Sequence, residues 1–340
     1  MKETTVINLQ DWQFLPFSAV PIGKRVKNTV INPEDNSVYY FKEPELKYPW
    51  EHWTEIAASK IGAHLDFNVL DYNIGIYGDR VGCISKSMTE PEDELIHGQQ
   101  FLTQIKPKFD KKKGSDHSFQ LINVVFQDPN LYAQFGEFLK MIVFDAIIGN
   151  RDRHQQNWGV IRTVRVAMKK GKIDAHTFRK ERNFWNFILN ILKGQTGLDS
   201  LIKNIDIKEE YSFTPFFDNG NCLGYNLTNE AINIYLQNEE KLKTYLFGKK
   251  ATSHIKWENE NLTHIELLRK VSEIYPNGIN GIIGECLTKY KKSDLETIIY
   301  SLDNNFDNKR HGIYALTLQR KELMCKLIKL RIDSLQQLLV

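Results

Sequence analysis

Eight polar residues, Asn150-Arg151-Asp152-Arg153-His154-Gln155-Gln156-Asn157, follow directly after an apolar segment of the chain. In that segment, residues 132–148, hydrophobic side chains recur at three- and four-residue steps, which predicts a helix with one buried face. Gly149 supplies the stop signal for this helix. A polar stretch after a helix is most often a solvated loop, so its interpretation depends on the spacing within it and on motifs elsewhere.

Within this loop, Asp152 and Asn157 stand five residues apart. Protein-kinase catalytic loops place the base Asp and a metal-ligating Asn at this spacing. The Asp accepts or orients the proton of the attacking hydroxyl, and the Asn offers a neutral oxygen to Mg²⁺ beside the phosphates. His154 could hydrogen-bond within the loop or steady the transferred phosphate, and a structural role is equally open. Arg153 is predicted either to compensate phosphate charge or to face solvent.

A second motif, Asp218-Asn219-Gly220, follows a predicted short strand at residues 212–217. Kinases present their main Mg²⁺ carboxylate in this way, as an Asp at a strand end. The same three residues also form an ordinary turn in many proteins. The motif therefore points to a metal site only in combination with the loop at Asp152.

A third pair lies earlier in the chain. Lys42 ends a predicted apolar strand, residues 37–42, and Glu55 lies in the helix predicted for residues 50–61, with Gly62 as its stop signal. A strand Lys paired with a helix Glu holds the ATP phosphates in kinases. Each alone is more often a solvated surface charge, but their order ahead of the other two motifs supports a kinase.

The distribution of predicted elements indicates two unequal parts. Strands are predicted at residues 26–31, 37–42, 69–76 and 80–84, around the single helix, and a polar stretch follows at residues 85–94. The rest is mainly helical, with a strand at 158–165, helical patterning at 184–192 and from 264 onward, and the longest helical stretch at 316–339. The sequence thus predicts an α+β, bilobal, protein-kinase-like fold, with a β-rich N-lobe at residues 1–88 and a helical C-lobe at 89–340.

Composition excludes several other classes of protein. The chain has 340 residues, 41% of them hydrophobic and 26% charged, as expected of a globular protein. A net charge of +3 does not suggest direct binding of nucleic acid. The four cysteines form no C-x-x-C pair, which argues against disulfides and zinc. Neither a signal peptide nor a stable membrane segment is apparent, which predicts a cytoplasmic protein unless export uses another signal.

These motifs together resemble the HipA-like kinases, bacterial serine/threonine kinases that include toxins of toxin–antitoxin systems. The resemblance implies ATP and Mg²⁺ as cofactors, Asp152 as catalytic base, Asn157 and Asp218 as Mg²⁺ ligands, and Lys42 on the phosphates with Glu55 as its partner. It also places a phosphate-covering loop at residues 18–27 and an adenine-contacting hinge in the stretch after the last N-lobe strand. The residues that carry the resemblance are Phe41-Lys42-Glu43-Pro44, Glu55, Ile148 to Gly159, and Thr214 to Gly220; those assigned to the loop and hinge are Gly23, Lys24, Ser87 and Met88.

The sequence departs from this family in three places. The phosphate loop contains Gly23 but no G-x-G-x-x-G, and Ser18 stands where some members autophosphorylate. A basic insertion, at about residues 162–210, separates Asn157 from Asp218 and is predicted to be either a solvated helical segment or a docking element. Only a short segment precedes the loop, which suggests a minimal member and leaves room for a small antitoxin or regulatory partner.

The predicted function is therefore a Mg·ATP-dependent serine/threonine protein kinase, a toxin or effector, that phosphorylates a protein substrate and itself. Two other functions stay open. Asp152-Arg153-His154-x-x-Asn157 also matches the loop of phosphoinositide kinases, and a nucleotide-binding pseudokinase could serve as a partner module. Some kinase-like folds transfer AMP instead, and the sequence does not exclude that reaction.

Overall fold

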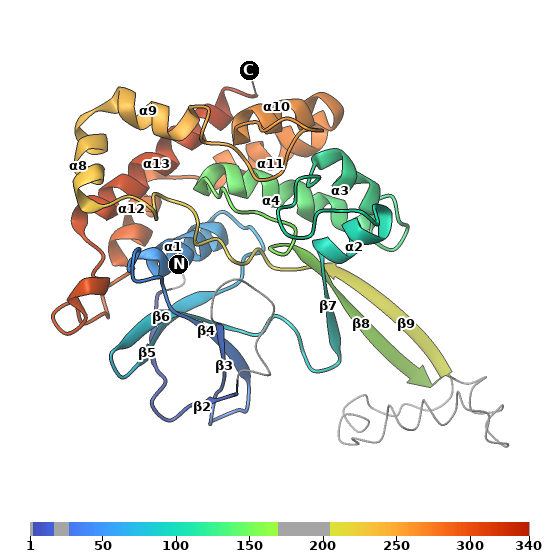
Figure 1. Ribbon diagram of the computed structural model, residues 1–340, viewed down its shortest axis with the longest axis horizontal. Coiled ribbons are helices and arrows are strands. Elements are labelled where there is room, and N and C mark those ends of the chain that lie inside the picture. The colour runs from blue at the N-terminus through green and yellow to red at the C-terminus, as the bar shows by residue number, and fades with distance from the viewer. Residues whose placement is uncertain (1–2, 17–26, 169–204, 340) are drawn as a thin grey trace.

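Two β-sheets and a helical layer make up the part of the chain that the structure, a computed structural model, describes: residues 3–16, 27–168 and 205–339. Figure 1 shows the curled larger sheet below and the helices gathered above it. The predicted α+β class is confirmed. The larger sheet has the strand order β1-β5-β6-β4-β3-β2, and its strands are β1 (Val6–Asn8), β2 (Gln13–Phe14), β3 (Lys27–Ile31), β4 (Val38–Lys42), β5 (Tyr72–Tyr77) and β6 (Arg80–Lys86).

Two hairpins form the centre of this sheet, as the sequence predicts. In the first, β3 pairs antiparallel with β4, and Asn36 adopts a φ of 59° in the connecting turn. In the second, Tyr77 pairs with Arg80 across the turn Gly78-Asp79, where Gly78 has a φ of 61°. A two-residue turn with glycine at positive φ matches the right-handed twist of the strands it joins. Between the hairpins, β4 and β6 pair antiparallel and bring Lys42 to the middle of the sheet.

In the sequence, helix α1 (Glu51–His64) lies between the two hairpins. It packs against the larger sheet and is almost wholly buried. The predicted stop at Gly62 is wrong, because the helix continues to His64. Gly62 has a packing role instead. A Cβ atom at this position would lie 2.4 Å from Cγ1 of Val69 and 3.0 Å from the ring of Phe144. The glycine therefore allows α1 to pack closely against its neighbours.

The smaller sheet has the order β7-β8-β9 and extends away from the helices (Figure 1). Its first strand, β7 (Asp93–His97), begins inside the predicted polar stretch, and β8 (Gly159–Met168) and β9 (Ile205–Phe213) are longer than predicted. The predicted insertion at 162–210 is thus strand at both of its ends, while the helical patterning at 184–192 lies outside the described residues.

The strand predicted at residues 212–217 is also wrong beyond Phe213, where β9 ends. After β9 the chain leaves the smaller sheet, and Phe216 pairs with the segment that follows α1. Its backbone N–H donates to the carbonyl oxygen of Asn68 at 2.7 Å, and it forms a parallel bridge with Val69. This change of partner carries the chain toward Asp218.

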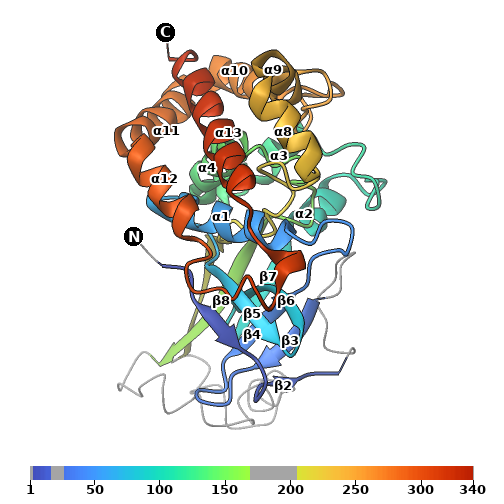
Figure 2. The ribbon, with the colours of Figure 1, turned by 90° about the vertical axis from the view of Figure 1, so that its left-hand side faces the viewer.

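The helices pack around α4 (Phe135–Ile148), which lies at the centre of the helical layer (Figures 1 and 2). Gly149 ends it with a φ of 70°, as predicted. The sequence predicts the helices after residue 264 but not α8 and α9. The other helices are α2 (Gly98–Ile105), α3 (Phe119–Val125), η2 (Tyr132–Gln134), α8 (Asn229–Gln237), α9 (Glu239–Phe247), α10 (His264–Ile274), α11 (Pro276–Lys289), α12 (Lys292–Ser301), η3 (Gly312–Tyr314) and α13 (Leu318–Gln336).

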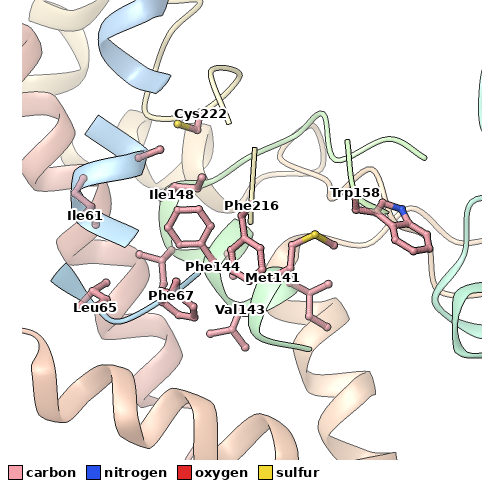
Figure 3. Close-up of a cluster of buried hydrophobic side chains, with 14 of the residues drawn as sticks. Ile61, Leu65, Phe67, Met141, Val143, Phe144, Ile148, Trp158, Phe216 and Cys222 are labelled. Carbon is pink, nitrogen blue, oxygen red and sulfur yellow. The ribbon is translucent and has the colours of Figure 1, made fainter. Parts of the chain in front are cut away.

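An aromatic cluster joins α4 to the segment that follows α1 and to the segment just before Asp218 (Figure 3). The ring of Phe144 lies 5.2 Å from that of Phe67 and 5.7 Å from that of Phe216. All three side chains are buried, and burial of each aromatic ring contributes about 1.5–3 kcal/mol. The cluster therefore fixes the backbone just before Asp218 relative to the central helix.

Within the described residues, no helix combines the length and the apolar character needed to cross a membrane. The division into lobes at residue 88 remains a proposal, and residues 87–92 link β6 of the larger sheet to β7 of the smaller one.

Candidate active site

Lys42 and Glu55 meet in the interior, as the sequence predicts. Lys42 lies at the end of β4 and Glu55 in the second turn of α1, and their side chains are 8% and 1% exposed. The Nζ atom of Lys42 lies 3.4 Å from Oε2 of Glu55. Because both charges are buried, each needs the other as a partner.

Glu55 also holds the turn that presents Asp218. The backbone N–H groups of Asn219 and Gly220 donate to its Oε1 and Oε2 atoms at 2.6 and 2.9 Å. Hydrogen bonds from backbone N–H groups to a carboxylate are among the stronger ones in proteins. Asp218 itself has a φ of 54°, a left-handed conformation that costs energy for a residue with a side chain. Glu55 thus stabilises the conformation of the residue predicted to bind the metal, a role that the sequence does not reveal.

Two lysines contact the Asp218 carboxylate. Nζ of Lys42 contacts Oδ1, and Nζ of Lys27 lies 3.8 Å from Oδ2. Lys27 begins β3 and pairs with Lys42 in the register of the β3–β4 hairpin. The sequence analysis missed Lys27, although the register of the predicted hairpin could have identified it. The ammonium groups of the two lysines and the Asp218 carboxylate therefore lie together at one end of the β3–β4 hairpin.

Arg153 is fully buried and connects three parts of the site, so the predicted solvent exposure is wrong, and its compensation of phosphate charge stays a prediction. Its Nε and Nη2 atoms donate to Oδ2 and Oδ1 of Asp145 in α4 at 2.9 and 2.7 Å. It also donates to the backbone oxygens of Asn157 and Phe217 at 2.8 and 2.7 Å, and to Oδ1 of Asn219 at 2.6 Å. Burial acts to lower the Arg153 pKa, but the Asp145 carboxylate outweighs it and the pKa is raised. Arg153 ties the predicted catalytic loop to the Asp218 turn.

Asp152 and Asn157 lie in one tightly hydrogen-bonded loop. The Nδ2 atom of Asn157 donates to the backbone oxygen of Asp152 at 2.8 Å, and the backbone N–H of Asp152 donates to Oδ1 of Asn150 at 3.0 Å. Nδ2 of Asn221, just after the Asp218 turn, donates to Oδ2 of Asp152 at 2.5 Å. The contact with Asn221 orients the Asp152 carboxylate. The Asn157 amide uses its nitrogen within the loop, and its oxygen is the atom that would bind a cation.

The other predicted site residues have weaker support. His154 hydrogen-bonds within the loop, where its Nδ1 accepts from the backbone N–H of Gln156 at 3.2 Å. Its predicted contact with phosphate stays a prediction. Met88 is half-buried and lies just after β6, and its contact with adenine is likewise untested. The predicted loop residues Gly23, Lys24 and Ser18 lie outside the described residues.

The loop is also held from the helical side, through the carbonyl oxygen of Asn150. Nε2 of His264, at the start of α10, lies 2.6 Å from that oxygen. Burial and the nearby Arg331 lower the pKa of His264 to about 3. His264 is therefore neutral when it donates to Asn150.

We expect this buried histidine to make the protein less stable in acid. As pH falls below about 6.5, the unfolded chain binds a proton at this position and the folded protein does not. The contribution of His264 to stability is thus full above pH 6.5 and is lost progressively as the pH falls toward 3. Between pH 7 and 5, the free energy of unfolding should fall by about 2 kcal/mol more in the wild type than in His264→Gln.

Urea unfolding at the two pH values measures this difference, with Lys270→Gln, an exposed position on α10, as the control. Equal pH dependence in the wild type and His264→Gln would contradict the prediction.

The donor set of the site suits Mg²⁺. Asp218 offers a carboxylate and Asn157 an amide oxygen, which are the hard oxygen ligands that Mg²⁺ prefers. Among the described residues, no group of three or more His, Cys, Asp or Glu side chains could hold a metal ion. A Mg²⁺ ion held by one or two protein oxygens completes its shell with water and substrate phosphates, so the two residues fit a metal that arrives with a nucleotide.

Comparisons with known proteins bear on the fold and on the family resemblance. No family model matches the chain. It is 28% identical over 141 residues to the serine/threonine-protein kinase CtkA of Helicobacter pylori, and the match covers 38% of this chain and 42% of that protein. The match thus spans less than half the length of this curated relative.

A crystal structure of CtkA, a proinflammatory kinase of Helicobacter pylori, superposes with a TM-score of 0.70 and 17% identity over 98% of both chains. HipA in a complex with HipB and operator DNA, from Shewanella oneidensis, reaches a TM-score of 0.45 with 10% identity, covering 95% of this chain and 67% of that one. The second similarity is too low to establish a common fold. The chain has the α+β, protein-kinase-like fold of CtkA, and its resemblance to serine/threonine kinases is confirmed.

Proposed function

We propose that this protein is a Mg·ATP-dependent serine/threonine protein kinase of the HipA-like type. The observation that carries the proposal is the arrangement around Lys42, which contacts the carboxylates of both Glu55 and Asp218. The segment just after Asp218 is hydrogen-bonded to the loop that holds Asp152 and Asn157. Arg153 and Asn221 join the two halves of this arrangement. An ordinary solvated loop is not expected to be linked by a buried arginine to a turn more than sixty residues away in the sequence.

The chain's own residues have distinct roles in this proposal. Asp152, oriented by Asn221, accepts the proton of the acceptor hydroxyl while the oxygen of that hydroxyl forms a bond to the γ-phosphorus of ATP. The bond between that phosphorus and the bridging oxygen breaks, and ADP leaves. Glu55 holds Lys42 and the Asp218 turn in place, so that the phosphates meet a fixed set of charges. When bound to Asp218 and Asn157, Mg²⁺ supplies positive charge that neutralises the phosphate oxygens.

Lys27 is a second phosphate-binding lysine in this proposal. It lies 3.8 Å from Asp218 and opposite Lys42 in the β3–β4 register, so both ammonium groups are close enough to this site to bind nucleotide phosphates. Lys27→Gln should weaken binding of ATP and ADP by about tenfold, the effect of one charge-assisted hydrogen bond, and leave adenosine binding unchanged.

Isothermal titration calorimetry with the three ligands measures this, with exposed Lys86→Gln on β6 as the control. An equal loss for adenosine would place Lys27 outside the phosphate site.

The fate of ATP tests the proposed function itself. The protein is incubated with Mg²⁺ and ATP labelled in either the γ- or the α-phosphate, together with a bacterial protein extract or phosphoinositide vesicles. Label from the γ-position on serine or threonine, with release of ADP, is the expected result. Transfer of the α-label with release of pyrophosphate would indicate AMP transfer, labelled vesicles a lipid kinase, and nucleotide binding without transfer a pseudokinase.

The toxin role and the small antitoxin partner are proposals that rest on the HipA-like resemblance of the sequence. If the protein is a toxin, expression of the wild type should arrest bacterial growth and expression of Asp152→Ala should not. Equal growth of the two strains would argue against this role.

A further inference from the structure

A pocket of about 260 Å³ lies beside Asp152, on the helical side of the loop. One wall is the chain that follows the Asp218 turn, and another is the C-terminal end of α9. The side chains that matter for its chemistry are those of Arg151, Asp152, Asn221, Tyr225, Asn226 and Tyr245. Because Asp152 is the proposed base, a group bound in this pocket lies next to the position of the acceptor hydroxyl.

The first wall is held in one conformation. Leu223 and Gly224 have φ values of 49° and 79°, and the backbone N–H of Tyr225 donates to the oxygen of Cys222 at 2.9 Å. This combination defines a tight turn with two left-handed residues. The indole N–H of Trp50, at the start of α1, donates to the backbone oxygen of Tyr225. The pocket is therefore a preformed feature of the fold.

Arg151 is oriented within this pocket by Tyr245. Its Nη2 atom donates to the backbone oxygen of Tyr245 at 2.9 Å, and its guanidinium carbon lies 4.7 Å from the centroid of the Tyr245 ring. The hydroxyl of Tyr245 in turn donates to Oδ1 of Asn226 at 3.2 Å. Within residues 3–16, 27–168 and 205–339, no carboxylate forms an ion pair with Arg151.

An arginine fixed over an aromatic ring keeps several N–H donors for an anion, and its planar fork suits carboxylate and phosphate groups. Here the anion would come from the substrate, because the protein supplies none within the described contacts of Arg151. We propose that Arg151 makes this kinase select acceptor serines or threonines that have an acidic or phosphorylated side chain close by in the peptide. This inference rests on the proposed function and specifies its substrate class.

The charges of the pocket favour a peptide over a phosphoinositide. Arg151 is the single cation among the lining residues, and Asp152 offsets its charge. A headgroup with several phosphates would need several cations, whereas one carboxylate or one phosphate on a peptide needs only one. The neutral amides of Asn221 and Asn226 and the ring of Tyr225 suit the polar backbone of an extended peptide.

Serine-centred peptides that carry Asp, Glu, phosphoserine, Ala or Lys at the flanking positions provide the test. The quantity measured is the ratio of kcat/KM for each charged peptide to that for the alanine peptide, with Mg·ATP. The wild type should prefer the anionic peptides by about tenfold, the size of one charge-assisted hydrogen bond. Arg151→Gln should bring this ratio close to one, and Arg151→Glu should reverse it in favour of the lysine peptide.

Arg151→Lys, which keeps the charge but not the planar fork, should retain part of the preference. Arg269→Gln, at an exposed arginine of α10, is the matched control and should leave the ratio unchanged. A general disturbance of Asp152 would lower the rates for all peptides alike and would not move the ratio. The three Arg151 variants are compared by thermal unfolding, so that a variant that fails to fold is replaced by one of the other two.

The outcomes separate this inference from the function on which it rests. If the wild type phosphorylates the peptides but shows no anionic preference, or if Arg151→Glu keeps that preference, the inference is wrong and the kinase proposal stands. If phosphoinositide vesicles are labelled and no peptide is, the acceptor is a lipid and the protein-kinase proposal fails together with the inference. Absence of transfer to either acceptor overturns both as well.

Discussion

Asp152→Asn is expected to lower kcat for phosphate transfer by roughly 10²–10⁴-fold, the usual contribution of a general base. Asparagine keeps the shape of the side chain and can still contact Asn221, but its amide cannot take the proton of the acceptor hydroxyl. The loop should keep its conformation, because Asn150 and Asn157 hold the backbone of residue 152 and not its carboxylate. The affinity for ATP should therefore change little.

Single-turnover transfer from γ-labelled ATP measures the rate, and calorimetry measures the affinity. Asp116→Asn, at a carboxylate that pairs with Lys106 near the surface, is the control and should have wild-type activity. If Asp152→Asn retained the wild-type rate, another group would have to orient the hydroxyl. If it lost ATP binding in parallel with activity, Asp152 would have a structural role.

Arg153→Met is expected to lower the free energy of unfolding by about 3–5 kcal/mol, because it leaves the Asp145 carboxylate buried without its partner. Asp145 is 3% exposed, and burial already raises its pKa. The substitution also removes donors from the backbone oxygens of Asn157 and Phe217. Loss of these contacts should loosen the loop relative to the Asp218 turn and abolish transfer.

Urea unfolding followed by circular dichroism measures this effect. The double variant Arg153→Met/Asp145→Leu removes both charges and should recover part of the lost stability, since a buried ion pair can often be replaced by apolar groups. Arg165→Met serves as the surface control, because this arginine has a side chain 68% exposed and pairs with Glu210. A loss for Arg153→Met as small as that for Arg165→Met would show that the buried pair is not important for the fold.

The features predictable from sequence are those set by local spacing. The five-residue step from Asp152 to Asn157 and the helix stop at Gly149 both depend on neighbours along the chain. Lys42 and Glu55 could be predicted because a strand and the helix after it pack together. The position of Asp218 needed the resemblance to a family, since a long segment separates it from the loop.

The features that could not be predicted depend on tertiary packing. Arg153 was expected at the phosphates or in solvent because it lies in a polar loop, yet Asp145, which is hidden in an apolar helix, draws it into the core. Gly62 is the residue type that usually ends a helix, but here the lack of a side chain allows close packing against Val69. Neither fact is visible until the elements are placed in space.

Other differences concern weak local signals. Helices α8 and α9 are short, with nine residues each, but their N-caps could have been recognised. Oγ1 of Thr228 accepts from the backbone N–H of Ala231 at 3.3 Å, and Oδ1 of Asn238 accepts from that of Lys241 at 2.9 Å. Capping residues of this kind mark helix starts even in polar sequences.

The most direct test of the central claim, that Asp152 and Asp218 form one phosphotransfer site, is transfer of γ-labelled phosphate from Mg·ATP to protein by the wild type, Asp152→Ala and Asp218→Ala. The wild type should label serine or threonine, and both variants should lose transfer. Asp218→Ala should in addition lose the dependence of ATP binding on Mg²⁺, which Asp152→Ala should keep. Transfer that persists in both variants would contradict the assignment of this site.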